Sequence, residues 1–320
     1  MAVTQQAHPA RSLSGVGRLD HPAQRIISLL PSATEIVCAL GLQDRLVAVT
    51  HECDFPADAI ASIPRITSNL LPPEVTRSRD IDAAVRSAVA GGHGLYALDE
   101  PMLANLGADL VLTQELCRVC AVSYPMVLEA ARTAGGEHGP LVVSLEPHSM
   151  GDVLATIGLV GRLAGVEARA TELVDVLSAR LAAIERPDRA PRLAVIEWLD
   201  PLFAPGHWVP EQVELAGGEP VIGRPHEPSR EMSWENLAEA NPEVVVLGLC
   251  GFDLTRSLEE WEAFPRPEPL TRTRAWRAAQ VWAIDGSAYV SRPGPRLVDG
   301  VEILSAVLAG RPDHRAVSLR

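Results

Sequence analysis

The chain has 320 residues, of which 47% are hydrophobic, and a formal net charge of -13 at pH 7. This length and hydrophobic content allow two buried cores of about 125 to 150 residues each. The negative charge argues against a nucleic-acid-binding surface, and no stretch reaches the roughly 18 consecutive apolar residues of a membrane span. We therefore expect a globular chain that acts as a monomer and has no nucleic acid partner.

The N-terminal segment 1–24 is polar and is interrupted by proline and glycine. It lacks the apolar region of a secretory signal peptide, so we predict a disordered leader over 1–24. The chain also has five cysteines. An odd number of cysteines without a secretory signal is typical of reduced thiols rather than of a disulfide framework. These two features together predict a cytoplasmic location.

Two stretches of the chain repeat the same order of predicted elements. Opening strands begin at Arg25 and Arg192, and a helix that ends at glycine follows each of them. Further along, 103–112 and 237–247 match almost position for position, because each passes through an acidic turn into an apolar strand. The pattern predicts an internal duplication of an α/β unit.

A long helical segment separates the two repeats. Ser149 followed by Asp152 is typical of a helix N-cap, and apolar residues then recur at helical spacing as far as Gly165. A second helix is predicted over 167–185, and roughly 19 residues at 1.5 Å per residue extend about 28 Å. The helix alone is also compatible with an ordinary crossover inside one sheet, but its flanks favour two lobes. We therefore predict an α/β fold of two Rossmann-like lobes joined by a long bridging helix, with a ligand cleft between them.

These elements set the expected domain boundaries. The leader 1–24 precedes an N-terminal α/β lobe (25–148), a bridging helical segment (149–190), a C-terminal α/β lobe (191–311) and a tail (312–320). Within the first lobe, 66–94 has no counterpart in the second lobe. We interpret it as an insertion with a helix over 81–90.

Functional side chains follow the second predicted strand of the first lobe. His51, Glu52, Cys53 and Asp54 come directly after the apolar run 46–49. Open α/β sheets bind ligands at the carboxyl ends of their strands, so we expect this loop to contact a ligand. The alternative is that His51 and Asp54 only hold the loop together.

A C-x-x-C motif follows the next buried strand. Cys117 and Cys120, with Tyr124 beyond them, are candidate ligand contacts. Such a pair can bind a metal or act as a redox pair, although one pair alone is a weak signal. Cys53 and Cys250 also lie just past strand ends. The four thiols are therefore candidate metal ligands, and they define the alternative function of a cytosolic thiol or metal-site protein or enzyme.

The second lobe places aromatic side chains in its loops. Glu197, Trp198, His207 and Trp208 follow its opening strand. Exposed aromatic surface lowers solubility, so these loops suggest an apolar wall for a flat ligand. The alternative is that both tryptophans cover the lobe's own core. Further candidate contacts follow the later strands: Cys250, Phe252, Tyr289 and Arg292.

Several motifs together resemble the cobalamin and iron-siderophore class of periplasmic binding proteins. They are the opening ISLLPSATEIVCALGL, the loop THECDFP and the closing SRPGPRLVDGVEIL. More narrowly, TQELCRVCAVSY, EWLDPLF, GHWVPE and CGFDL look like the cobalamin-binding subgroup, the substrate-binding proteins of ABC importers. The resemblance extends over about 25–310.

The resemblance implies a protein that binds cobalamin or a related corrinoid in the cleft, that is not an enzyme and that uses no catalytic cofactor. It also implies a possible ABC permease partner and a docking carboxylate on each lobe. Glu235 matches the docking position of the second lobe, whereas the first lobe has Pro101 there, with Glu100 one residue before it. The alternative for Glu235 is simple charge compensation at a helix N-terminus.

Overall fold

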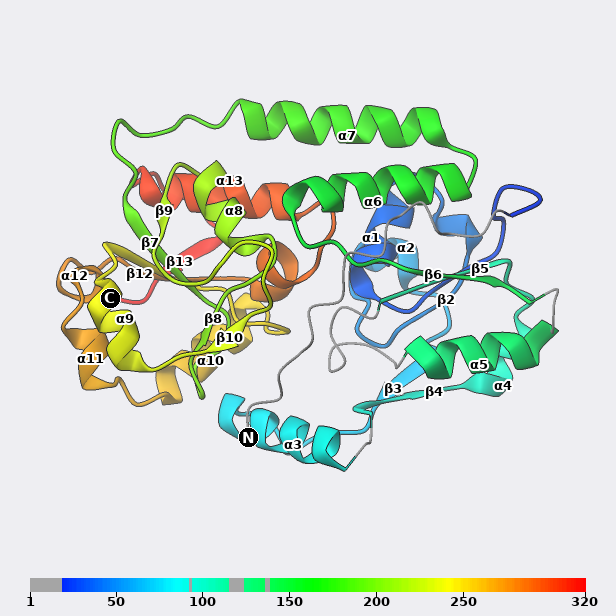
Figure 1. The fold of residues 1–320 in the computed structure, drawn as a ribbon, viewed down its shortest axis with the longest axis horizontal. Coiled ribbons are helices and arrows are strands. Elements are labelled where there is room, and N and C mark those ends of the chain that lie inside the picture. Colours follow the sequence, from blue (N-terminus) through cyan, green and yellow to red (C-terminus); the bar gives the residue numbers. More distant parts are fainter. Residues whose placement is uncertain (1–18, 92–93, 115–123, 136–138) are drawn as a thin grey trace. The chain divides into compact units, whose positions relative to one another are not determined.

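The computed structural model describes residues 19–91, 94–114, 124–135 and 139–320, and Figure 1 labels their elements. The chain forms two compact units. Unit 1 takes in the described residues of Met1–Asn69, Tyr96–Glu146 and Gly158–Ala170. Unit 2 takes in those of Leu70–Leu95, Pro147–Ile157 and Thr171–Arg320. The chain therefore passes between the units more often than the expected boundaries imply.

A four-stranded parallel sheet forms the centre of unit 1, with the order β2-β1-β5-β6. Its strands are β1 (Ile26–Ser28), β2 (Leu46–Val49), β5 (Leu110–Thr113) and β6 (Leu141–Ser144). Every residue of β1 and β5 is buried, as is usual for parallel strands covered on both faces. The other elements of this unit are α1 (Pro31–Ala39), η2 (Gln43–Arg45), α2 (Ala57–Ile60), α4 (Glu100–Asn105), α5 (Tyr124–Gly135) and the antiparallel pair β3 (Thr67–Asn69) and β4 (Tyr96–Leu98).

A five-stranded sheet forms the centre of unit 2, with the order β13-β12-β11-β7-β9. Its strands are β7 (Arg192–Ile196), β9 (Glu219–Pro220), β11 (Val244–Leu247), β12 (Val281–Ile284) and β13 (Ala316–Ser318). A short antiparallel pair joins β8 (Phe203–Ala204) to β10 (Arg230–Glu231). The helices are α3 (Ser78–Ala90), α8 (Val209–Leu215), α9 (Trp234–Ala240), α10 (Leu254–Ala263), α11 (Glu268–Thr271), α12 (Arg274–Arg277), the π-helical turn η4 (Ser287–Ser291) and α13 (Leu297–Leu308).

The two sheets share one strand order, since β2-β1-β5-β6 corresponds to β9-β7-β11-β12. One acidic residue in each unit joins the opening strand to its neighbour. The carboxylates of Asp109 and Glu243 accept the N–H groups of Arg25 and Arg192, each at 3.1 Å. The N–H groups of Asp109 and Glu243 donate in return to the carbonyls of Arg25 and Arg192, at 3.0 and 2.8 Å. These bonds explain the repeated acidic turn and confirm the predicted duplication and fold class.

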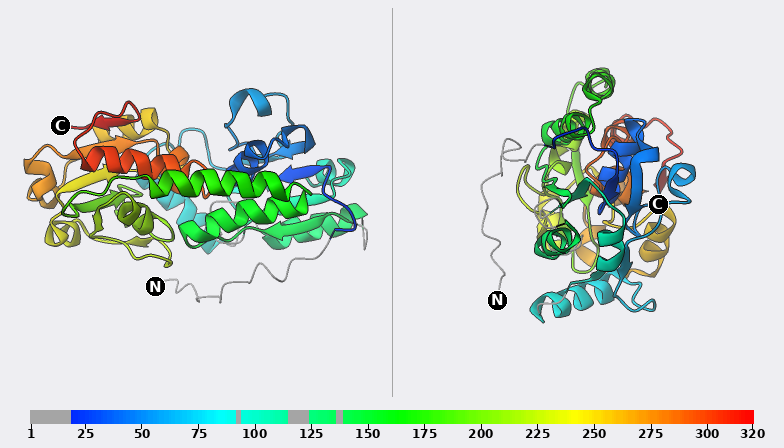
Figure 2. Two further views of the ribbon diagram at one scale, coloured as in Figure 1. Left: turned by 90° about the horizontal axis from the view of Figure 1, so that it is seen from above. Right: turned by 90° about the vertical axis from the view of Figure 1, so that its right-hand side faces the viewer.

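The predicted bridging segment consists of two helices, α6 (Met150–Leu163) and α7 (Glu167–Ala182), which lie side by side near the turn that joins them (Figures 1 and 2). The predicted N-cap is confirmed, because the Asp152 N–H donates to the Ser149 hydroxyl at 3.0 Å. The chain turns at Gly165, whose φ of +67° lies in the left-handed region that favours glycine. A side chain there would also meet the Pro22 ring, 2.7 Å from the position of a Cβ atom.

Both expected terminal segments are corrected by the structure. Ala23 is 0% exposed and its N–H donates to the Leu163 carbonyl at 2.9 Å, so the described end of the predicted leader packs on unit 1. The expected tail contributes β13, which pairs antiparallel with β12. A three-residue strand is too short to show a periodic pattern, which is why the sequence did not predict it.

The helix of the predicted first-lobe insertion, α3, belongs to unit 2. The Glu260 side chain, which is 4% exposed, accepts the N–H and the O–H of Ser78 at 3.2 and 2.6 Å. The same carboxylate pairs with Arg77 at 3.2 Å. The Ser78 carbonyl accepts the indole N–H of Trp198 at 3.2 Å, and Ile81 packs against the core of the unit. Glu260 therefore anchors the first turn of α3.

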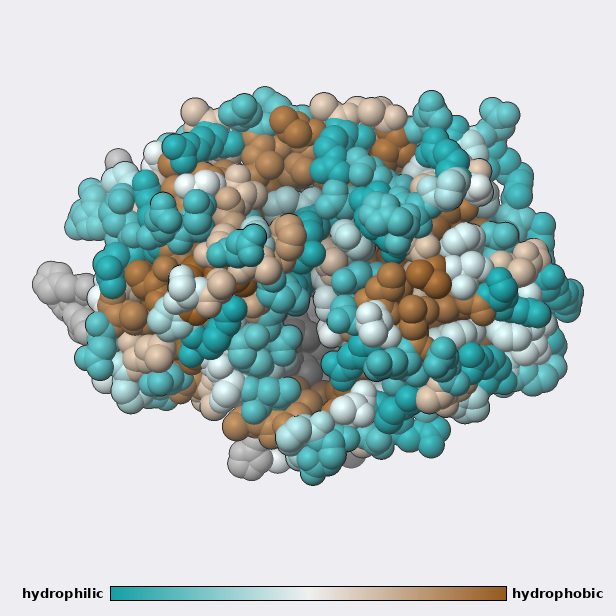
Figure 3. Space-filling model, turned by 180° about the vertical axis from the view of Figure 1, so that it is seen from behind, coloured by the Kyte–Doolittle hydropathy of each residue, from teal (hydrophilic) through white to brown (hydrophobic). Residues whose placement is uncertain are grey.

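The described residues contain no helix that is long and apolar enough to cross a membrane. On the face shown in Figure 3, hydrophobic side chains reach the surface in patches with hydrophilic side chains around them. Apolar surface distributed in this way is ordinary on a folded protein.

Replacing Glu260 with Ala should release the start of α3, because Ser78 and Arg77 lose their buried acceptor. Hydrogen bonds to charged groups contribute about 1.5 to 3 kcal/mol each, so we expect the free energy of unfolding to fall by about 3 kcal/mol. Amide exchange in α3 should also become faster. Glu259 is exposed on the same helix, and Glu259→Ala should change stability by less than about 0.5 kcal/mol. Equal effects of the two substitutions in denaturant melts would contradict this role of Glu260.

Candidate functional site

The loops after β7, β11 and β12 are hydrogen-bonded to one another at the carboxyl edge of the unit 2 sheet. The Cys250 N–H donates to the Glu197 carbonyl at 2.9 Å, and the Ser287 N–H donates to the Phe252 carbonyl at 3.0 Å. Carboxyl ends of parallel strands meet at one edge of a sheet, where open α/β folds bind their ligands. The structure thus brings Glu197, Cys250 and Phe252 of the predicted set together.

Glu197 carries a carboxyl group that is kept neutral by its surroundings. The pKa of this carboxyl is raised to about 8, chiefly by burial and to a smaller degree by the neighbouring Cys250. Hydrogen bonds from the Ser229 side chain and the Gly206 backbone oppose the shift and do not cancel it. A protonated carboxyl is a hydrogen-bond donor, so near neutral pH Glu197 adds no negative charge to this edge of the sheet.

The aromatic rings of the unit 2 loops lie largely inside the unit, which corrects the expectation of an open aromatic wall. Trp208 is 5% exposed and its indole N–H donates to the Val290 carbonyl at 2.8 Å. Phe252 is 2% exposed, and the half-buried Trp198 packs edge-on against it at 5.2 Å between ring centroids. The alternative that both tryptophans cover the core of their own lobe therefore describes the buried Trp208, and the half-buried Trp198 also packs against the core.

His207 covers the buried Trp208 ring. The two rings are stacked with centroids 5.6 Å apart, and the His148 ring lies 5.5 Å from His207 on another side. Burial, and then the neighbouring His148, lowers the pKa of His207 to about 4. His207 is therefore a neutral imidazole at physiological pH. His148 was not among the predicted contacts; its position directly before the Ser149 N-cap is the only signal that the sequence offers.

Tyr289 and Arg292 lie in and just after η4, which follows β12. Tyr289 is half-buried, and the Arg315 guanidinium lies 6.0 Å above its ring. Burial raises the pKa of the Tyr289 phenol, so it stays protonated. The Gln212 side-chain N–H donates to the Tyr289 carbonyl at 3.0 Å and joins this turn to α8.

In unit 1, the loop after β2 is held by His51. Its Nδ1 lies 2.7 Å from the Thr67 hydroxyl, and its Nε2 lies 3.2 Å from the Glu52 carboxylate. The ring also packs at 5.2 Å from Tyr96. These contacts connect the loop to β3 and β4, as the alternative interpretation of His51 expects. The Glu52 side chain is more exposed to solvent than the His51 side chain.

The remaining residues of this loop divide into a buried and an exposed set. Cys53 is 3% exposed, with its Sγ 3.1 Å from the Thr34 hydroxyl. Asp54 and Phe55 are exposed, and Phe55 shows 43% of its surface. Sequence reasoning did not select Phe55, although an exposed aromatic residue at a strand-end loop is a typical ligand contact.

The predicted four-thiol metal site has no support. Cys117 and Cys120 lie outside the described residues, as does the side chain of Tyr124. Cys53 is buried within unit 1, while Cys250 is exposed in unit 2. In the part of the chain that the structure describes, no group of three or more His, Cys, Asp or Glu side chains is arranged to hold a metal ion.

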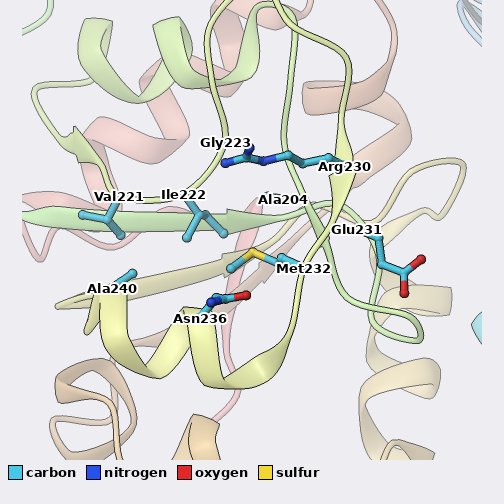
Figure 4. Close-up of a pocket in the computed structure, with 9 residues that line it drawn as sticks. All are labelled: Ala204, Val221, Ile222, Gly223, Arg230, Glu231, Met232, Asn236 and Ala240. Atoms are coloured by element: carbon cyan, nitrogen blue, oxygen red, sulfur yellow. The ribbon is translucent and has the colours of Figure 1, made fainter. Parts of the chain in front are cut away.

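A cavity of about 410 Å³ lies elsewhere in unit 2, between α9, β9 and the β8–β10 pair. Figure 4 shows the side chains of Val221, Ile222 and Met232 directed into it, while the Glu231 carboxylate points away. None of the predicted ligand contacts lines this cavity. Its volume suits a small molecule rather than a tetrapyrrole.

The two candidate docking carboxylates occupy the first turns of equivalent helices. Ser233 caps α9 and Asp99 caps α4, each accepting a backbone N–H from its own helix. Glu235 is therefore the second residue of α9, while Glu100 is the first residue of α4. Both side chains are exposed. The offset of one residue that the sequence shows is thus present in the structure.

Stability should depend on pH through Glu197. Between its ordinary pKa of 4.5 and the folded value of about 8, the folded state holds a proton that the unfolded state releases. Stability is therefore lost as pH rises through this window. From about pH 6 to about pH 9 we expect a fall of about 2.5 kcal/mol, measured by urea unfolding.

Glu197→Gln should abolish this fall, because the amide does not ionise. Glu100→Gln, which removes an exposed carboxylate, should keep the pH profile of the parent chain. A parallel pH profile in Glu197→Gln would show that another group causes the dependence.

Comparisons with known proteins show what the chain is similar to. No protein-family model matches it. It is 23% identical over 288 residues to a vitamin B12-binding protein of Vibrio cholerae, covering 88% of this chain and 87% of that protein. It is 25% identical over 288 residues to a cobalamin-binding protein of Halobacterium salinarum, covering 88% of this chain and 68% of that protein. An ABC transporter substrate-binding lipoprotein of Bacillus subtilis is 23% identical over 297 residues, which cover 88% of this chain and 79% of that protein.

Solved structures share the fold. The periplasmic vitamin B12-binding protein of Vibrio cholerae matches with a TM-score of 0.60 and 22% identity, covering 90% of this chain and 97% of that one. A periplasmic heme-binding protein of Roseiflexus matches with a TM-score of 0.65 and 21% identity, covering 90% of this chain and 98% of that one. These relatives are named as binding proteins, so the expectation that the chain is not an enzyme is confirmed, and the thiol enzyme alternative is not supported.

The expected cytoplasmic location is wrong, because the similar proteins are named periplasmic or substrate-binding lipoproteins. Two of the free thiols are protected from oxidation, because Cys53 is buried and burial raises the pKa of Cys38 to about 11. Free thiols of this kind are therefore no evidence for a reducing compartment. The comparisons confirm that this chain resembles the cobalamin and iron-siderophore class of periplasmic binding proteins of ABC importers.

Proposed function

We propose that this chain is a substrate-binding protein of an importer and that its substrate is cobalamin or a close corrinoid relative. The similarity to the vitamin B12-binding and cobalamin-binding proteins, over 88% of the chain, is the observation that carries the proposal. Loops with polar and aromatic side chains at the carboxyl edge of each sheet support it, because such edges bind ligands in open α/β folds.

We propose ligand contacts in each unit. Unit 1 contributes the loop after β2, with Glu52, Asp54 and the exposed ring of Phe55. Unit 2 contributes a set that surrounds the carboxyl edge of its sheet: Glu197, Trp198, His207, Cys250, Tyr289 and Arg292. Trp208 and Phe252 act beneath this layer, where they fix the positions of His207 and Trp198. Most of the unit 2 contacts are neutral near pH 7, which suits a ligand with amide side chains.

Titration of the purified protein with cyanocobalamin tests the substrate. We expect a dissociation constant in or below the micromolar range, measured by isothermal titration calorimetry. Hemin, which carries carboxylates in place of amides, should bind at least about tenfold more weakly, because the uncharged Glu197 and His207 give its carboxylates no ion pair and Arg292 is the one cation of the proposed set. Tight hemin binding without measurable cobalamin binding would assign the chain to heme instead.

The docking carboxylates predict a separate defect. Glu235→Arg should leave cobalamin affinity within about twofold of the parent value and should abolish productive docking, because like charges would then face the cationic permease residues that the resemblance implies. Stimulation of the cognate importer's ATPase in proteoliposomes is the measurement. Glu239→Arg makes the same change of charge at another exposed position of α9 and should reduce the ATPase stimulation much less. If both variants stimulate equally well, Glu235 has no docking role.

A further inference from the structure

His148 and His207 form a pair of imidazole rings that no hydrogen bond within the described residues satisfies. Their ring centroids lie 5.5 Å apart, and both residues are only half-buried. The Nδ1 atom of each ring is nevertheless fully buried and has no hydrogen-bond partner among the described residues. The outer part of each ring therefore meets solvent while the inner nitrogen faces protein.

This arrangement selects one tautomer for each neutral ring. A neutral imidazole carries its proton on either Nδ1 or Nε2, and its environment decides which. A buried N–H without an acceptor is costlier and rarer in proteins than a buried lone pair. The proton therefore belongs on Nε2 in both rings. The low pKa of His207 agrees with a neutral ring at this position.

The backbone of His207 is held in an unfavourable conformation. The φ of His207 is +50°, a region that residues other than glycine seldom adopt. Two backbone hydrogen bonds fix it, since its N–H donates to the Glu227 carbonyl at 2.7 Å and its carbonyl accepts the His226 N–H at 2.9 Å. A Cβ atom on Gly206 would lie 2.3 Å from the Glu227 carbonyl oxygen, so only glycine allows this close approach.

His148 is fixed from the opposite side by the start of α6. Its N–H donates to the Asp152 carboxylate at 3.0 Å, and the Met150 N–H donates to the Glu211 carboxylate at 2.6 Å. Because Glu211 belongs to α8, this second bond ties the start of α6 to the helix that follows His207. Two segments far apart in the sequence are thus joined so that the imidazoles are neighbours.

We propose that His148 and His207 act together as two neutral N–H donors for the carboxamide oxygens at the rim of a corrinoid. The proposal rests on the proposed function and specifies how the site distinguishes its substrate class. A carboxamide oxygen has two lone pairs, so it can accept from two donor nitrogens that lie about 5 Å apart. Two imidazole rings with centroids 5.5 Å apart are close enough for their N–H groups to share one such oxygen or to bind neighbouring ones. An imidazole N–H donor without charge offers a carboxylate no ion pair.

The test measures affinity for cyanocobalamin, whose cobalt has both axial positions filled. His148→Ala and His207→Ala should each weaken binding about tenfold. His148→Gln and His207→Gln restore an N–H donor near the Nε2 position and should recover most of that loss. His314→Ala is the control, because the His314 side chain is 93% exposed and lies in the C-terminal segment. Melting curves identify any variant that has lost its fold.

Each outcome has one meaning. Unchanged affinity in a folded His148→Ala variant overturns the paired-donor role and leaves the proposed function intact. Gln variants as weak as the Ala variants show that the rings pack against the ligand without donating, and this overturns the proposal. A loss seen with aquacobalamin and not with cyanocobalamin makes the histidines cobalt ligands instead. If the parent chain binds no corrinoid at all, the proposed function itself fails.

Discussion

Two carboxylates, those of Asp109 and Glu243, set the register on which the rest of each unit depends. Each joins the opening strand of its sheet to the next parallel strand through hydrogen bonds in both directions. Once these strands are in register, their carboxyl ends lie at one edge, and the loops that follow them are brought together there. Asp109 and Glu243 pair the strands near their amino ends. This pairing fixes where the carboxyl ends of the same strands lie, and the candidate site is formed there.

Among the proposed contacts of unit 2, Arg292 is the one charged side chain, although the whole chain carries a net charge of -13. Burial keeps Glu197 protonated and His207 uncharged near pH 7. Both groups then present N–H or O–H donors without a counter-charge. A neutral, donor-rich surface next to buried aromatic rings suits a large ligand with amide acceptors, which connects the electrostatics of the site to the corrinoid proposal.

Sequence patterns predicted the duplication of the α/β unit because the repeated acidic turns and apolar runs are local signals. They also predicted the N-cap at Ser149, which depends on a spacing of three residues. They did not place α3 in unit 2, because its anchor on Glu260 joins residues 182 positions apart. Burial was equally hard to predict: Trp208 looks like an exposed loop residue in the sequence, but its indole N–H finds an acceptor at Val290. His148 escaped notice because its partner His207 is adjacent only in the folded chain.

A crystal structure of the protein bound to cyanocobalamin tests the central claim most directly. The account predicts that the corrin lies at the carboxyl edge of the β7 and β11 strands, with carboxamide oxygens within hydrogen-bonding distance of His148 and His207. Glu197 should lie in the same surface, with its carboxyl acting as a donor. A corrin bound at the cavity beside Val221 and Met232, or on a surface remote from the strand ends, would contradict it.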